Sequence, residues 1–106
     1  MNDVLLVFCT FPDAEKARQI GTTLIESQLA ACVNLCPGVE SIYHWQGKVE
    51  TASEVLAIFK TTTSSYAFFE TKLRELHPYK VPEVVAVRPD QVCDRYAEWI
   101  IAETRA

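Results

Sequence analysis

The side chains best suited to chemistry in this chain are its four cysteines and two histidines. Cys9, Cys32, Cys36 and Cys93 form no C-x-x-C pair, a spacing that argues against a structural zinc site. Cys32 and Cys36 fall within one predicted strand, where four residues cover about 13 Å, so in a regular strand these two cannot bridge each other. We therefore expect four reduced thiols, as in a cytosolic protein.

Charged side chains could in principle support acid–base chemistry. The set to consider is Lys48, Glu50, Glu54, Lys60 and Glu83. No nucleophile is paired with a base along the chain, and nothing indicates a coupled pair of carboxylates. The three glycines are far apart, which argues against a Gly-rich phosphate-binding loop. We predict no enzymatic activity and expect these charges to form ion pairs that set strand register between subunits.

Length and composition indicate one ordinary globular domain over residues 1–106. Apolar residues make up 49% of the 106 residues and charged residues 23%, enough for a single modest core. The net charge of −4 argues against nucleic acid as a partner, because phosphate binding requires a concentrated basic face. No signal peptide or membrane span is expected, so the predicted location is the cytoplasm.

Hydrophobic periodicity predicts an α+β fold. Strands are expected at Val4–Phe11, at Leu29–Leu35, over both arms of residues 39–62 and at Val84–Val87, with helices from Asp13 to near Gln28, from about Tyr66 to Pro78 and from Pro89-Asp90 onward. This order is β-α-β-β-α-β plus a final helix, which is the ferredoxin-like arrangement with two helices on one face of a four-stranded antiparallel sheet. The last helix is expected to bury a stripe of Val92, Tyr96, Trp99 and Ile100.

Residues 39–62 predict a hairpin too long for the domain that carries it. Its two arms meet at Gln46-Gly47-Lys48, and each spans roughly 35 Å, whereas a domain of about 100 residues has a radius of gyration near 13 Å. The apolar side chains of the hairpin would be costly to leave in water, so we expect another copy of the chain to cover them. The predicted interface consists of Tyr43, His44, Trp45, Val55, Ala57 and Phe59.

Four segments together carry a resemblance to a known family. They are LAACVN at 29–34, YHWQGKVE at 43–50, Glu54 with Lys60-Thr61-Thr62, and HPYKVPE at 77–83. In these segments the chain closely resembles the CutA family of divalent-cation tolerance proteins. The resemblance implies a ferredoxin-like homotrimer whose long hairpin reaches a neighbouring subunit. It further implies a cytoplasmic protein linked to tolerance of copper and other divalent metals, with no catalysed reaction.

The same resemblance implies candidate ligands. The family's proposed metal ligands correspond to Cys9 and His77, and copper is the first metal to consider because thiolate and imidazole ligands suit it. An alternative is that Cys9 is an inert core residue. Lys60, Tyr79 and Glu83 are implied to lie near a small-ligand cleft between subunits. His44 could ligate a metal between subunits or could be an ordinary interface residue.

Three other functions remain as alternatives to metal tolerance. A signalling trimer that binds a small molecule, as nitrogen-regulatory PII proteins do, is possible by analogy of fold alone. A structural scaffold without any ligand is equally compatible with the sequence. An acylphosphatase-like hydrolase is disfavoured, because that chemistry requires an anion-binding loop and an arginine after the first strand, where this chain has Thr10-Phe11-Pro12-Asp13.

Overall fold

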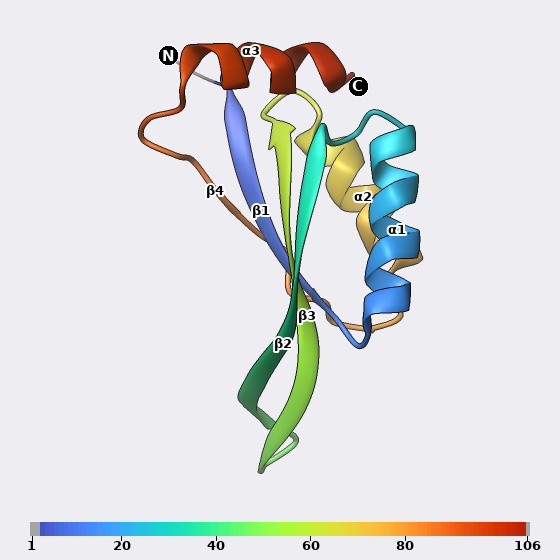
Figure 1. The fold of residues 1–106 in the computed structure, drawn as a ribbon. Coiled ribbons are helices and arrows are strands. Elements are labelled where there is room, and N and C mark those ends of the chain that lie inside the picture. Colours follow the sequence, from blue (N-terminus) through green and yellow to red (C-terminus); the bar gives the residue numbers. More distant parts are fainter. Residues whose placement is uncertain (1–2, 106) are drawn as a thin grey trace.

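The computed structural model describes residues 3–105 and confirms the predicted order of elements (Figure 1). The elements are β1 (Val4–Phe11), α1 (Ala14–Glu26), β2 (Cys32–Trp45), β3 (Lys48–Thr62), α2 (Tyr66–Leu76), β4 (Val85–Val87) and α3 (Asp94–Glu103). The sheet has the order β2-β3-β1-β4 with antiparallel neighbours. The fold is therefore the ferredoxin-like one that the sequence predicts.

Local sequence explains where the first helix and the hairpin turn form. Asp13 caps α1, with its carboxylate accepting a hydrogen bond from the Lys16 amide at 2.7 Å. Gln46 and Gly47 connect β2 to β3 with φ angles of 50° and 80°, the left-handed conformation that a tight two-residue hairpin turn requires. The register of β2 against β3 shifts between Cys36 and Val39, so the strand is irregular at Pro37-Gly38, as at a β-bulge.

The main core lies between the sheet and the two helices α1 and α2. It contains Val7, Cys9 and Phe11 of β1, Ile20 and Leu24 of α1, Val55, Ala57 and Phe59 of β3, and Phe69 and Leu73 of α2. The interface prediction was therefore wrong for Val55, Ala57 and Phe59. Strand alternation placed these three side chains on one face correctly, but α1 and α2 of the same chain already cover that face.

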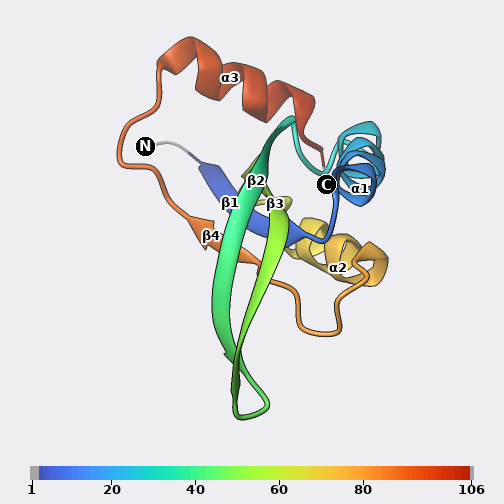
Figure 2. The ribbon, with the colours of Figure 1, turned by 60° about the horizontal axis from the view of Figure 1, so that its bottom comes forward.

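The opposite face of the sheet carries apolar side chains that neither α1 nor α2 covers. The β-sheet register places Leu6, Phe8, Leu56, Ile58, Val85 and Val87 together there, and we call this set the uncovered face. Val85 and Val87 are 50% and 39% exposed. Helix α3 lies across the end of the sheet where β1 begins (Figures 1 and 2), so most of this face is left without a partner in the single chain.

The hairpin projects from the body, as predicted (Figures 1 and 2). The molecule measures 44 × 26 × 22 Å, and its long axis reflects the arms of β2 and β3. Four apolar residues near the tip are 44–71% exposed: Ile42, Tyr43, Trp45 and Val49. We call residues 42–49 the hairpin tip.

In residues 3–105 no helix is both long and apolar enough to cross a membrane.

Two elements begin three or more residues after their predicted starts. Strand β2 begins at Cys32 and not at Leu29, because Gln28 adopts a left-handed conformation and the Leu29 amide bonds back to the Leu24 carbonyl at 3.1 Å. Helix α3 begins at Asp94, four residues after Asp90.

The buried face of α3 also differs from the predicted stripe. Ile100 is fully buried, as predicted, and packs with Ala97, Val4 and Ala31, with the partly buried Val92 against this cluster. Tyr96 and Trp99 are 40% and 43% exposed, so their assignment to the buried stripe was wrong for this chain. The helix meets the sheet end along the line of Ala97 and Ile100, which leaves Tyr96 and Trp99 at its side.

Candidate functional site

The predicted site residue His77 lies directly after α2 and packs against the end of β1. Its ring stacks on Phe11 with 4.7 Å between centroids and 17° between planes. The Tyr79 amide donates a hydrogen bond to His77 Nδ1 at 3.0 Å, and His77 Nε2 lies 2.8 Å from the Thr10 carbonyl. Because a backbone amide can only donate, Nδ1 is the acceptor and Nε2 carries the proton that the Thr10 carbonyl accepts.

This histidine is held in its neutral form. Burial lowers the pKa of His77 from its usual value, against smaller opposing effects from the Thr10 hydrogen bond and from Glu54. Both ring nitrogens are already engaged within the chain. A metal ion could bind His77 only by displacing one of these two hydrogen bonds.

Tyr79 connects the segment after α2 to the base of the hairpin. Its hydroxyl donates to Glu54 Oε2 at 2.6 Å, a short hydrogen bond to a carboxylate that is only 9% exposed. Burial is the main cause that raises the pKa of Tyr79 well above its usual value, and the hydrogen bond to Glu54 is the second. The tyrosine is therefore a permanent donor to Glu54 at physiological pH.

Cys9 lies beside the same carbonyl. Its Sγ is 3.8 Å from the Thr10 oxygen, and the residue is fully buried. Burial raises the pKa of the Cys9 thiol to about 12, with further contributions from the negative charges of Glu83 and Glu54. We call the set Cys9, Thr10, Phe11, Glu54, His77 and Tyr79 the polar corner. It brings a thiol, an imidazole and a carboxylate together at the end of β1.

Comparison with known proteins identifies the family to which this chain belongs. The family model described as "CutA1 divalent ion tolerance protein" matches residues 5–103. The chain belongs to this family. The divalent-cation tolerance protein CutA of Thermus thermophilus is 42% identical over 104 residues, which cover 98% of this chain and 99% of that protein.

A plant relative and a solved structure extend the comparison. The chloroplastic protein CutA of Arabidopsis thaliana is 39% identical over 95% of this chain, which corresponds to 56% of that protein. The crystal structure of CutA from Xylella fastidiosa superimposes with a TM-score of 0.94 at 41% identity, covering 97% of this chain and 99% of that one. The ferredoxin-like fold described above is thus the fold of this CutA1 family.

Within this CutA1 fold, the predicted metal ligands Cys9 and His77 are brought to one backbone carbonyl. Among residues 3–105, however, no group of three or more histidine, cysteine, aspartate or glutamate side chains is arranged to hold a metal ion. The pair alone leaves a divalent ion with open coordination positions. The metal site therefore stays a prediction, and it requires further ligands from water or another subunit.

The predicted small-ligand residues divide between two places in the single chain. Tyr79 belongs to the polar corner, and the Glu83 carboxylate is close enough to raise the pKa of the Cys9 thiol. Lys60 lies six residues beyond Glu54 along β3, a distance of about 20 Å, and its ammonium contacts Asn34 and Cys32 instead. The cleft between subunits that these residues would line stays a prediction.

Two members of the polar corner were not predicted as a pair. Glu54 and Tyr79 are separated by 25 residues, and no spacing rule connects them. The available signal was Glu54 itself, a carboxylate directly before the buried apolar run of β3, where a charge must find a donor.

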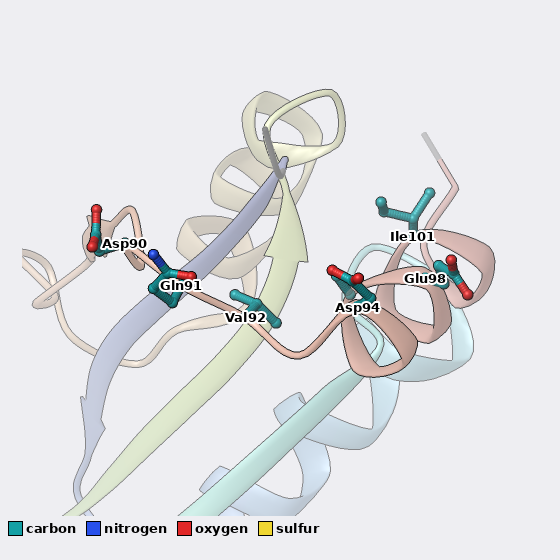
Figure 3. A pocket seen from close by; sticks show the side chains of 7 residues that line it. Asp90, Gln91, Val92, Asp94, Glu98 and Ile101 are labelled. Carbon is teal, nitrogen blue, oxygen red and sulfur yellow. The ribbon is translucent and has the colours of Figure 1, made fainter.

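A separate hollow lies between α3 and the segment that precedes it (Figure 3). Its volume is about 440 Å³, and it is lined by Asp90, Gln91, Val92, Asp94, Ala97, Glu98 and Ile101. The sticks in Figure 3 show carboxylates from both the loop and the helix around it. None of the predicted site residues lines this hollow, so the candidate site of this CutA1 protein remains the polar corner.

Proposed function

We propose that this protein contributes to divalent-cation tolerance as a homotrimer that binds copper or another divalent cation weakly and catalyses no reaction. The observation that carries the metal proposal is the convergence of the Cys9 thiol and the His77 imidazole on the Thr10 carbonyl. Thiolate and imidazole are ligands that copper and zinc favour. The negative charges of Glu54 and Glu83 near Cys9 add attraction for a cation.

The same geometry explains why binding would be weak. A metal requires the Cys9 thiolate, but burial raises the pKa of this thiol to about 12. It also requires a free imidazole nitrogen, but both nitrogens of His77 have partners. Metal binding must therefore release a proton and break a hydrogen bond, so its affinity is expected to increase with pH.

Self-assembly is proposed from two surfaces that the single chain leaves open. The hairpin tip exposes Tyr43 and Trp45 at 44% and 49%, and the uncovered face presents β4 valines to solvent. Apolar surface of this kind, spread over two sides of a small chain, is typical of a protein–protein interface. The resemblance to CutA proteins supports three copies.

Four free cysteines support a reducing compartment, and we propose the cytoplasm.

The test of the metal site is a calorimetric titration of the assembled protein with Cu²⁺ and, separately, Zn²⁺. We expect binding at a fixed stoichiometry for the wild type and loss of that binding in the double variant Cys9→Ser, His77→Ala. The matched control is Cys93→Ser, which removes an exposed cysteine outside the polar corner and should leave the titration unchanged. Unaltered metal binding in the Cys9/His77 variant would show that the ligands lie elsewhere.

A further inference from the structure

A cysteine and a lysine lie directly opposite each other on neighbouring strands, away from the polar corner. Cys32 of β2 pairs with Lys60 of β3 in the strand register, and Lys60 Nζ lies 3.9 Å from Cys32 Sγ. Cross-strand partners in an antiparallel sheet keep their Cβ atoms about 4.5–5.5 Å apart. The register therefore keeps the two residues opposite each other, and the Lys60 side-chain conformation brings its nitrogen to the sulfur.

Two further side chains surround this pair. The Asn34 side-chain oxygen accepts a hydrogen bond from the Lys60 amine. Burial, and to a smaller extent the nearby Cys32 thiol, raise the pKa of Tyr96 on α3, which places Tyr96 close to Cys32. Side chains of β2, β3 and α3 thus gather around the cysteine sulfur. Both Cys32 and Lys60 are half-buried in the single chain. They lie on the side of the uncovered face, at the end of the sheet beneath α3, so the proposal requires that peroxide reaches this end in the assembled protein.

The other cysteines lack this arrangement. Cys36 lies on the same face of β2 but pairs with Leu56. Cys9 is fully buried in the core, and Cys93 is an exposed residue at the start of α3. Of the four cysteines, Cys32 is the one with an amine as its cross-strand partner.

We propose that peroxide oxidation of Cys32 leads to a reversible covalent sulfur–nitrogen cross-link with Lys60. Hydrogen peroxide first converts the thiol to a sulfenic acid, transferring one oxygen to sulfur and releasing one water. After the Lys60 ammonium releases a proton to solvent, the lone pair of its nitrogen attacks this sulfur. The S–N bond forms, the S–O bond breaks, and hydroxide leaves with the amine proton as a second water.

The cross-link would alter both strands at this end of the sheet. It removes the positive charge of Lys60 and ties β2 covalently to β3 beneath α3. A thiol reverses it by attacking sulfur, which returns the free amine and forms a mixed disulfide that excess thiol reduces. The pair would thus be a reversible peroxide-responsive modification site, independent of whether the polar corner binds metal.

Mass spectrometry of the assembled, metal-free protein after brief peroxide treatment tests this proposal. We expect an intact mass lower by two hydrogen atoms. Trypsin cannot cleave after a modified lysine, so digestion should yield residues 19–48 linked to residues 49–72. Dithiothreitol should restore the original mass and the separate peptides.

Three variants make the result specific. Cys36→Ser should keep the cross-link, because Cys36 faces leucine, whereas Cys32→Ser and Lys60→Arg should each lose it. In Lys60→Arg the sulfenic acid should persist and react with dimedone, provided that circular dichroism shows the variant is folded. Absence of the linked peptides in the folded wild type, or their persistence in Lys60→Arg, would overturn the proposal.

Discussion

The hairpin tip exposes its apolar side chains, whereas the polar corner buries its polar side chains. At the tip, Ile42 and Val49 are 66% and 71% exposed and contribute nothing to the core of the chain. At the corner, His77 and Glu54 are 7% and 9% exposed, and each has a hydrogen-bond partner within the chain. This difference supports the proposal that the tip contacts a partner chain, whereas the polar groups of the corner are already paired within one chain and breaking their hydrogen bonds costs free energy.

Substitutions in these two regions should therefore have different effects. A change at the tip should alter assembly and leave the fold of each chain intact. A change at the corner should alter stability or metal binding, because its polar groups are buried and paired. The predictions below are arranged from the largest expected effect to the smallest.

Placing a charge on the hairpin tip should have the largest effect. We expect Val49→Asp to convert the assembled protein to monomers at micromolar concentration, because a carboxylate buried in an apolar interface without a partner is strongly unfavourable. Sedimentation velocity measures the change directly. The matched control is Phe68→Asp on α2, where the side chain is similarly exposed at 62% but lies on the helical side. Loss of assembly in the control but not at the tip would reverse our assignment of the two regions.

Removing one hydroxyl from the corner should have an intermediate effect. Tyr79→Phe leaves the buried Glu54 carboxylate without its 2.6 Å donor, which should lower the free energy of unfolding by about 1–3 kcal/mol. Urea unfolding at matched protein concentration gives this value. Tyr66→Phe at the start of α2, where the ring packs on the main core, is the control and should change stability by less than about 0.5 kcal/mol. Equal losses in both variants would mean that the Glu54 contact contributes nothing.

Much of the fold could be predicted from sequence because the signals were local. Alternation in β1 and β3, the cap at Asp13 and the Gln46-Gly47 turn each depend on neighbouring residues. What could not be predicted was which face of β3 meets the helices. Val55, Ala57 and Phe59 on one face and Leu56 and Ile58 on the other are equally apolar, so only the packing of α1 and α2 decides between them.

The proximity of Cys9 and His77 could be predicted from the sequence, whereas the hydrogen-bond network around them could not. The family motifs indicated Cys9 and His77, and the structure places both at the Thr10 carbonyl. The Glu54–Tyr79 bond joins residues far apart in the chain, so periodicity carries no information about it. The distance between Lys60 and the corner likewise depends on position along a twisted strand, which motif matching does not consider.

The pH dependence of stability should show the smallest effect. Because burial lowers the pKa of His77 in the folded protein, the unfolded chain binds this proton more tightly. The stabilisation is therefore present above the usual histidine pKa of about 6.5 and is lost as the pH falls below that value toward the folded-state pKa. One proton limits the slope to about 1.4 kcal/mol per pH unit. The variant His77→Gln retains a donor but does not titrate. Its urea unfolding midpoint should therefore change less between pH 7 and pH 5 than the midpoint of the wild type. An equal change in both proteins would contradict this role of His77.

The central claim of this account is that the exposed hairpin tip and the uncovered face complete the protein only on self-association. Sedimentation equilibrium of the wild-type protein at micromolar concentration tests it most directly. The account predicts a single species with three times the 12.0 kDa mass of the chain. A folded, monodisperse particle of one chain mass under the same conditions would contradict it.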